Sequence, residues 1–255
     1  MKRVSVVAPL YNEKDGIPML ADTLSQLALR LAPKYEMECV LVDDGSKDGS
    51  FEEAKRCFAS MPRVILVQLP YNQGPGAAVR NGFAKATGDY ICTIDSDCTF
   101  DPLRIPLMLE VMETQKVDIV TASPYHPEGG VENVPAWRLL LSRGASFLYR
   151  RLCSVKLYTY TSFMRAYRRE VIQTVGFDSN GFAAFTEILL RAAHRGYKVA
   201  EVPFVLKSRV IGVSKMKVMY TIQTHVEMMS KALWWRIAEP KPLNAVLAKE
   251  SVKNS

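Results

Sequence analysis

Ile91–Cys92–Thr93–Ile94–Asp95–Ser96–Asp97 is an apolar run that ends in two carboxylates separated by one small residue. Its β-branched residues predict a buried strand, which would bring its last side chains to the carboxyl edge of a parallel sheet. Ligands of open α/β sheets bind at that edge. In the turn after the strand, both carboxylates can converge on one hard cation, because such cations prefer carboxylate oxygens. An isolated Asp-x-Asp is more often a solvated loop, so the surrounding sequence must decide.

The residues before this stretch repeat a strand-then-helix pattern. The predicted strands are 4–9, 39–42, 64–69 and the run that ends at Asp95. Helical periodicity is found at 17–31 and 77–86. A further helix start is indicated by Ser50, with Glu52 and Glu53 in its first turn. Repeated strand-then-helix units within about 100 residues imply right-handed crossovers. The sequence therefore predicts an α/β fold with a doubly wound, mostly parallel sheet and helices on both faces.

The second half of the chain continues with helices and fewer strands. The predicted helices are 103–115, 137–152, 185–196 and 214–238, and the predicted strands are 119–122, 161–167 and 198–203. Residues 124–135, with two glycines and three prolines, are interpreted as a flap or a linker. The helix at 214–238 is amphipathic and forms the C-terminal element.

The net charge of +7 is distributed unevenly along the chain. Residues 1–133 hold 13 Lys and Arg against 19 Asp and Glu, whereas residues 134–217 hold 15 against 4. An acidic half can hold a metal ion, and a basic half can hold phosphate or anionic lipid. No nucleic-acid module and no ladder of aromatic and basic residues is recognisable, so nucleic acid is not expected as a partner.

Composition and cysteine usage indicate a cytoplasmic globular protein. Hydrophobic residues make up 48% and charged residues 23% of the chain. No apolar run approaches the ~20 residues that span a bilayer. The apolar run that begins at Val4 meets polar residues at 12–15, so it predicts a first strand rather than a signal peptide. The five cysteines are scattered and contain no Cys-x-x-Cys pair, which is typical of reduced thiols.

A second acidic loop follows the predicted strand 39–42. Asp43 and Asp44 begin it, and in a parallel sheet it opens into the same crevice as Asp95 and Asp97. A nucleotide explains both loops, because one carboxylate can bind the base or ribose while the other pair holds Mg²⁺ or Mn²⁺ against a diphosphate. Neither a Gly-x-Gly-x-x-Gly after the first strand nor a Walker lysine loop is present, so dinucleotide and P-loop interpretations are weak.

Several motifs of the first half resemble those of glycosyltransferase family 2. They are Val4–Val7, Pro9–Leu10–Tyr11–Asn12–Glu13, the turn Val42–Ser50, Asn72–Gln73–Gly74 and Gly88–Asp89. The second half is similar to the polyprenol- and dolichol-phosphate mannose synthase branch of that family. The similar residues there are 141–145, 165–168, Glu187 with Arg191, 201–203, and Arg209 with Gly212, Ser214 and Lys215.

The resemblance covers about residues 4–217 and implies a GT-A fold, which is Rossmann-like. It implies a glycosyltransferase domain at 1–217, with a nucleotide-binding half at 1–122 and an acceptor half at 123–217. An amphipathic helix and a tail would follow at 218–255. The implied reaction is the metal-dependent, inverting transfer of mannose or glucose from GDP-mannose or UDP-glucose to a polyprenyl or dolichyl phosphate, with Mg²⁺ or Mn²⁺ as cofactor.

The resemblance also implies the residues of the donor site. Asp95 and Asp97 would hold the metal, and Thr99 stands where the branch usually has a glutamine as third ligand. Asp97, Arg209 at the donor phosphates, and Glu187 would be the catalytic residues. The implied nucleotide-sugar site consists of Pro9, Tyr11, Glu13, Asp43, Asp44, Gly74, Asp95, Ser96 and Lys215.

The acceptor phosphate would be bound by Arg138, Ser142 and Arg143, by the same resemblance. Residues 159–165 depart from the pattern of this branch. The branch usually has an aspartate at the position of Thr159 and a glycine at the position of Phe163. An acceptor phosphate is anionic at neutral pH and needs no general base. A hydroxyl acceptor needs one, and Glu187 is the candidate, although it can instead pair with an arginine.

Two alternatives to lipid-phosphate glycosylation stay open. One is a soluble family 2 transferase that acts on a sugar or natural-product hydroxyl, and the other is a non-catalytic sugar-nucleotide-binding partner subunit. A lipid acceptor requires contact with a membrane surface or a membrane-embedded partner, peripherally on the cytoplasmic face. The stripe at 214–238, with Trp234 and Trp235, can lie in such an interface, or it can pack as core or as a subunit contact.

Overall fold

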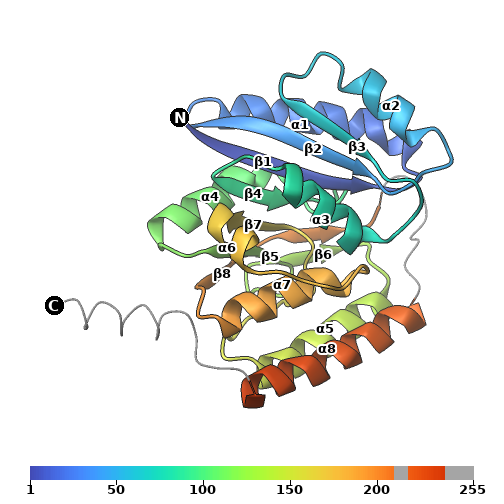
Figure 1. Cartoon of the computed structure of the whole chain (residues 1–255). Coiled ribbons are helices and arrows are strands. Elements are labelled where there is room, and N and C mark those ends of the chain that lie inside the picture. Colours follow the sequence, from blue (N-terminus) through green and yellow to red (C-terminus); the bar gives the residue numbers. More distant parts are fainter. Residues whose placement is uncertain (210–217, 239–255) are drawn as a thin grey trace.

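A seven-stranded sheet crosses the molecule (Figure 1). In spatial order its strands are β3 (Val64–Gln68), β2 (Tyr35–Asp43), β1 (Lys2–Leu10), β4 (Tyr90–Thr93), β7 (Arg165–Arg168), β5 (Ile119–Ser123) and β8 (Val199–Pro203). Neighbouring strands are parallel except at β7, which is antiparallel to both β4 and β5. The computed structural model describes residues 1–209 and 218–238. The predicted doubly wound, mostly parallel sheet is confirmed.

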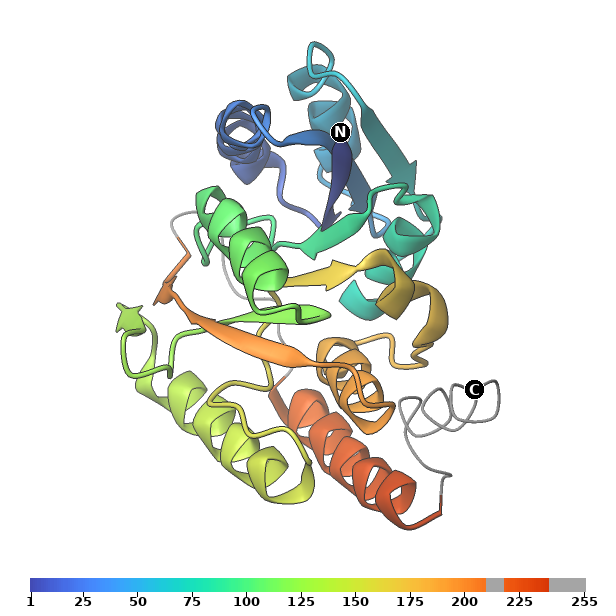
Figure 2. The same ribbon diagram turned by 90° about the vertical axis from the view of Figure 1, so that its left-hand side faces the viewer.

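Helices cover both faces of this sheet (Figures 1 and 2). They are α1 (Ile17–Leu31), α2 (Ser50–Cys57), α3 (Pro75–Lys85), α4 (Ile105–Thr114), α5 (Ala136–Leu152), α6 (Arg169–Thr174), α7 (Ala183–His194) and α8 (Val218–Ala238). Single 3₁₀ turns precede α1 and α4, at Lys14–Gly16 and Pro102–Arg104. Among the described helices, none is long and apolar enough to cross a membrane.

The core has two parts because successive side chains of a strand point to opposite faces. In β1, Val4 and Val6 pack with Leu24 of α1 and Met108 of α4. Val7 points to the other face, where residues of α3, α5, α7 and α8 form the second part of the core. The alternation of side chains along each strand therefore gives each face of the sheet its own set of helices.

The second sheet is an element that the sequence did not predict. It consists of β6 (Gly130–Glu132) and β9 (Val205–Lys207), which pair in parallel. The strand β6 lies inside the predicted loop 124–135, where three residues that include a glycine give no periodic signal. The strand β7 is also shorter than the predicted 161–167. The division of the chain at residues 122 and 217 stays a prediction.

The helices α5 and α8 lie side by side at the end of the molecule that is farthest from β3 (Figures 1 and 2). Tyr149 of α5 is fully buried, and its hydroxyl lies 3.0 Å from His225 Nδ1 and donates to the His225 carbonyl at 3.1 Å. Burial lowers the pKa of His225, so its neutral form is favoured in this contact. The pair therefore fastens the last described helix to α5.

Close packing of α3 on β1 depends on Gly82. A Cβ atom at this position would lie 2.4 Å from Val7 Cγ1 and 3.3 Å from Val42 Cγ2. We expect Gly82→Ala to lower the free energy of unfolding by about 1–3 kcal/mol, as overpacking of a core does. Gly144→Ala is the matched control, because nothing lies within 4 Å of its added Cβ. That variant should be neutral or gain about 0.5–1 kcal/mol from helix propensity. Equal stability of both variants in urea unfolding would contradict the close packing.

Candidate active site

The polar loops of the first half meet at one edge of the sheet. The strands β1 and β2 end in register, with Leu10 opposite Asp43, and Val7 of β1 lies opposite Thr93 at the end of β4. Glu13, the Asp43–Asp44 pair and the Asp95–Asp97 turn therefore follow strands that end side by side. This is the carboxyl edge of the sheet, where the sequence predicts the site.

Asp44 organises the loop that leads into α3. Its carboxylate accepts hydrogen bonds from Gln73 N at 2.8 Å, Gly74 N at 2.8 Å and Asn72 Nδ2 at 3.0 Å. Burial raises the pKa of Asp44, although the two backbone hydrogen bonds oppose that rise. The loop at 72–74 thus uses both oxygens of this carboxylate. Gly74 in that loop has a φ of +100°, a conformation that favours glycine.

Asp43 has one carboxylate oxygen without a hydrogen-bond partner among the described residues. The residue is only 1% exposed, and its Oδ2 accepts a hydrogen bond from Ser46 N at 3.2 Å. Its Oδ1 is buried and has no hydrogen-bond partner among the described residues. Buried carboxylate oxygens are nearly always hydrogen-bonded, so this oxygen is suited to accept a donor from a bound molecule.

The aspartates after β4 form a concentrated negative charge. Desolvation and the charge of Asp97 raise the pKa of Asp95 well above its usual range. The charges of Arg209 and Arg138 act in the opposite direction, as does a hydrogen bond with the Thr99 side chain. The structure therefore brings together the two predicted metal ligands and Thr99, and it places the charge of α5 within reach of them.

Arg209 bridges two of the site's carboxylates. Its Nε donates to Asp97 Oδ2 at 2.6 Å, and its Nη1 donates to Glu13 Oε1 at 2.9 Å. The backbone before it is also tied to the acidic turn, because Lys207 N donates to Thr99 O at 2.9 Å. The unpredicted strand β9 thus carries Arg209 to the donor site.

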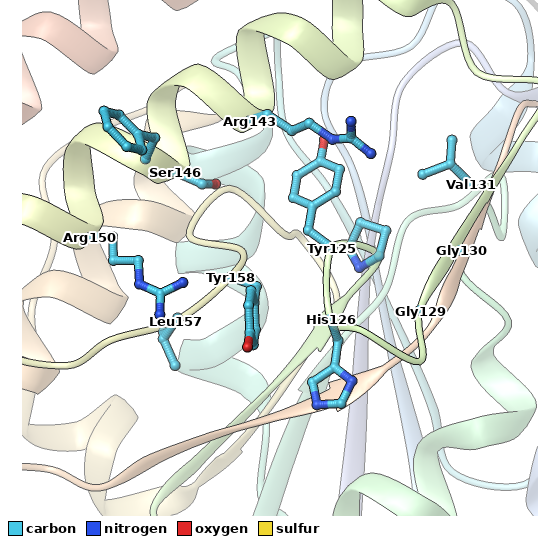
Figure 3. Close-up of a pocket in the computed structure, with 12 residues that line it drawn as sticks. Tyr125, His126, Gly129, Gly130, Val131, Arg143, Ser146, Arg150, Leu157 and Tyr158 are labelled. Atoms are coloured by element: carbon cyan, nitrogen blue, oxygen red, sulfur yellow. The ribbon is translucent and has the colours of Figure 1, made fainter.

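The residues predicted for the acceptor phosphate lie on α5. Ser142 Oγ lies 2.7 Å from Thr161 Oγ1, and the Arg143 guanidinium lies 5.0 Å from the centroid of the Tyr125 ring. A groove of about 560 Å³ runs between α5 and the turn at 124–131 (Figure 3). Its lining consists of Pro124, Tyr125, His126, Gly129, Gly130, Val131, Arg143, Ser146, Phe147, Arg150, Leu157 and Tyr158. Arg138 is the predicted acceptor residue whose charge acts on Asp95.

Glu187 is fully buried and paired with an arginine. Its Oε1 lies 2.7 Å from Arg191 Nη2, and its Oε2 accepts from Ser179 N at 2.9 Å. The loop that it holds is completed by Asn180, whose carbonyl accepts from Gly76 N at the start of α3 at 2.6 Å. This geometry corresponds to the arginine pair, and it gives Glu187 a role in anchoring a loop.

Comparison with known proteins identifies the family of this chain. The family model described as Glycosyl transferase family 2 matches residues 5–176. The chain belongs to glycosyltransferase family 2. The resemblance predicted from residues 4–217 is thereby confirmed, together with the α/β architecture and the prediction of a glycosyltransferase.

Two relatives of this family 2 glycosyltransferase carry names that describe lipid-linked mannose transfer. Dolichol-phosphate mannosyltransferase from Pyrococcus furiosus is 34% identical over 218 residues, which are 84% of this chain and 59% of the relative. The chain thus spans little more than half of that protein's length. Polyprenol monophosphomannose synthase from Mycolicibacterium smegmatis is 31% identical over 222 residues, which are 84% of this chain and 81% of the relative.

Solved structures share the fold of this glycosyltransferase at lower sequence identity. Glucosyl-3-phosphoglycerate synthase from Mycobacterium tuberculosis, in complex with phosphoglyceric acid, superposes with a TM-score of 0.67. The match covers 94% of this chain and 81% of that chain, at 20% identity. A complex of the same enzyme with Mn²⁺, UDP and phosphoglyceric acid gives a TM-score of 0.65.

The predicted donor residues of the glycosyltransferase lie at this edge with one exception. Lys215 lies outside the described residues. Pro9 is in β1, Tyr11 and Glu13 are in the loop after it, and Ser96 lies between the two metal-site aspartates. The described residues contain no group of three or more His, Cys, Asp or Glu side chains that could hold a metal ion. The ligand roles stay predictions.

Sequence reasoning did not find Thr161, Tyr125 or Arg150 next to the acceptor residues. Thr161 and Tyr125 lie outside helices and strands, where no periodic pattern marks a functional side chain. Arg150 lies on an amphipathic helix, where an arginine is most often solvated. The signal in the sequence was that the region around α5 contains several basic residues and no acidic residue.

The hydrogen bonds of Asp43 and Asp44 predict different effects of the same substitution. Asp44→Asn replaces an accepting oxygen with an NH₂ group that faces N–H donors. We expect it to lower the free energy of unfolding by about 1–3 kcal/mol. Asp43→Asn is the matched control and should cost less than about 1 kcal/mol, because its amide can occupy the position of the unpartnered Oδ1. Urea unfolding measures both, and a larger loss for Asp43→Asn would overturn the assignment of Asp44 to the loop.

Proposed function

We propose that this glycosyltransferase transfers a hexose from a nucleoside-diphosphate sugar to a polyprenyl phosphate, by a metal-dependent inverting reaction. The observation that carries the proposal is the acidic turn of Asp95 and Asp97, bridged by Arg209 and within reach of the charge of Arg138. A donor diphosphate and an acceptor phosphate can both be neutralised there. The names of the two relatives support mannose as the sugar and a polyprenol as the acceptor chain. GDP-mannose is the proposed donor.

The side chains of the acidic turn fit a hard divalent cation. Asp95, Asp97 and Thr99 offer only oxygen ligands, which Mg²⁺ and Mn²⁺ prefer. Desolvation and mutual repulsion make two adjacent carboxylates unfavourable without a countercharge. The M. tuberculosis enzyme of the same fold binds Mn²⁺ together with UDP. When bound, the cation would neutralise the negative charge that develops on the departing diphosphate.

The nucleoside would occupy the edge of the sheet beside β1 and β2. Asp43 Oδ1 is the acceptor for an N–H of the base, because it is buried and without a partner among the described residues. Pro9, Tyr11 and Glu13 would shape the pocket from the loop after β1. Asp44 would act through Gly74 and the loop that it holds, rather than by direct contact with the base.

The transfer step needs no proton to be moved. An oxygen of the acceptor phosphate forms the new bond to the anomeric carbon, while the bond from that carbon to the donor diphosphate breaks. Arg138 and Ser142 would orient the acceptor phosphate, and Arg143 would add positive charge. Arg209 would donate hydrogen bonds to the diphosphate as it leaves. Attack opposite the leaving group inverts the configuration.

A lipid acceptor requires contact with a membrane or with a membrane-embedded partner. The helices α5 and α8 expose large apolar side chains, among them Trp137, Leu140, Phe147, Val226 and Trp234. Basic residues interleave with them on α5. A surface of this composition suits the interface of a bilayer. We propose that the protein works peripherally on the cytoplasmic membrane face.

Binding of the donor gives the first test of the proposed function. GDP-, UDP- and dTDP-sugars with Mn²⁺ are compared by thermal shift, and the correct donor should raise Tm by about 5–10 °C at one hundred times its Kd. Asp97→Ala should abolish the metal-dependent part of that rise and lower turnover about 100-fold or more. The absence of metal-dependent stabilisation by any of them would refute the enzyme proposal. Unchanged turnover in the variant would favour a non-catalytic partner subunit.

Glu187→Gln distinguishes a phosphate acceptor from a hydroxyl acceptor. With a phosphate acceptor, turnover should stay within about 10-fold of the wild type, because no general base is required. The free energy of unfolding should fall by about 1–3 kcal/mol, since Arg191 loses one of its two carboxylates but keeps Asp178. Turnover is measured with a polyprenyl phosphate in detergent, and stability is measured by urea unfolding. A loss of several orders of magnitude in turnover would instead indicate a soluble transferase that acts on a hydroxyl.

A further inference from the structure

The groove between α5 and the turn at 124–131 is separate from the donor site. None of the donor-site carboxylates lines it, and its lining contains no acidic residue. Arg138 marks the end of α5 that acts on Asp95, and Arg150 lies twelve residues farther along the helix. At a rise of 1.5 Å per residue, this is a distance of about 18 Å along the helix axis. The groove shares Arg143 with the predicted acceptor site, and its Arg150 end lies away from the donor site.

Two guanidinium groups are held over aromatic rings in this groove (Figure 3). Arg143 lies 5.0 Å from the Tyr125 ring centroid, and Arg150 lies 5.0 Å from that of Tyr158. Neither arginine forms an ion pair with a carboxylate in the part of the chain that the structure describes. A ring beneath the guanidinium plane orients it and leaves its N–H edge for an acceptor. The two side chains are therefore prepared for an anion.

The electrostatic surroundings favour the same ligand charge. No aspartate or glutamate occurs in the sequence between Glu132 and Glu170, a stretch that contains the whole of α5. The groove also contains His126, which lies edge to face against Tyr158 at 5.7 Å. Glu128, in the turn at 124–131, and Glu201, whose carboxylate accepts from Tyr158 N at 2.6 Å and Thr159 N at 2.8 Å, do not line the groove. A phosphate group in the groove would thus meet two guanidinium groups.

The edge of the groove is apolar and exposed. Phe147 lines the groove and is 57% exposed, and it lies between Arg143 and Arg150 at helical spacing. Leu140 and Leu148, 73% and 48% exposed, continue the apolar surface on the same helix. A water-soluble phosphate would use the arginines and leave these side chains in water. An anion that carries apolar chains satisfies both surfaces.

We propose that this groove binds the phosphate headgroup of an anionic membrane phospholipid, with Phe147 and Leu148 at the level of the acyl chains. The groove is then an anchoring site that orients α5 on the bilayer, and it shares Arg143 with the predicted acceptor site. The proposal rests on the membrane contact of the proposed function, and it is independent of the sugar donor.

The experiment measures partition of the full chain into vesicles of phosphatidylcholine with 30% phosphatidylglycerol, by flotation at about 0.15 M salt. Arg150→Gln should lower partition about 20-fold or more. Arg151→Gln is the matched control, because it removes the same charge from the neighbouring position, does not line the groove and lies over Phe147 at 4.6 Å. Loss of one charge alone should lower partition by about 5-fold at most. Tyr158→Leu keeps the charge and should still lower partition about 3- to 10-fold, because it removes the ring beneath Arg150.

Several outcomes would overturn the proposal. Equal losses for Arg150→Gln and Arg151→Gln would indicate non-specific charge attraction and no site in the groove. Partition that does not depend on phosphatidylglycerol would indicate apolar insertion without binding of an anionic headgroup. Full competition by millimolar glycerol phosphate would identify a free phosphate ester as the ligand. Binding only to vesicles doped with polyprenyl phosphate would identify the acceptor as the occupant. These vesicles contain no sugar donor, and turnover of Arg150→Gln on a short-chain acceptor in detergent should be unchanged, so failure of the anchoring site and failure of the enzyme proposal are distinguishable.

Discussion

The concentration of carboxylates at the edge of the sheet constrains the rest of this structure. Glu13 and Asp97 share a single guanidinium, and Asp95 lies in the same field. Like charges this close are costly unless a cation is held among them. Arg209 is such a cation in the described part of the chain. It follows the strand β9, which is hydrogen-bonded to the acidic turn through Lys207 N and Thr99 O. These carboxylates belong to the acidic first half of the sequence, and Arg209 belongs to the basic second half.

How far the sequence predicted this arrangement depended on periodicity. The β–α units of the first half alternate clearly enough to predict the sheet, and the sheet in turn predicts that Asp43 and Asp95 share an edge. The pairing of β6 with β9 could not be predicted, because three-residue strands carry no pattern. Nor could the sequence distinguish the roles of Asp43 and Asp44. They are identical neighbours, and only the position of the loop at 72–74 shows that one carboxylate is occupied and the other is not.

Glu187 illustrates a second limit of the sequence. A glutamate and an arginine four residues apart on a helix form an ion pair in many proteins, yet the same glutamate could serve as a base. The structure adds the backbone amide of Ser179 and the contact of Asn180 with Gly76, and both tie the pair to the start of α3. A base must reach a proton on its substrate, and this carboxylate is directed into its own loop. This geometry supports the proposed phosphate acceptor, which needs no base.

The helix α5 connects the two ends of the proposed reaction. Near its start, Arg138 acts on the acidic turn, and near its end, Arg150 lies in the groove beside exposed apolar residues. A helix is stiff over this length, so the separation of about 18 Å between the two positions is fixed. The helix α8 is bound to α5 through the contacts of Tyr149 with His225. In the proposed reaction, an acceptor phosphate at the level of the headgroups would then meet the donor at a constant height above the bilayer. The proposed selectivity for a lipid phosphate would thus arise from the orientation of one helix as well as from contacts to the phosphate itself.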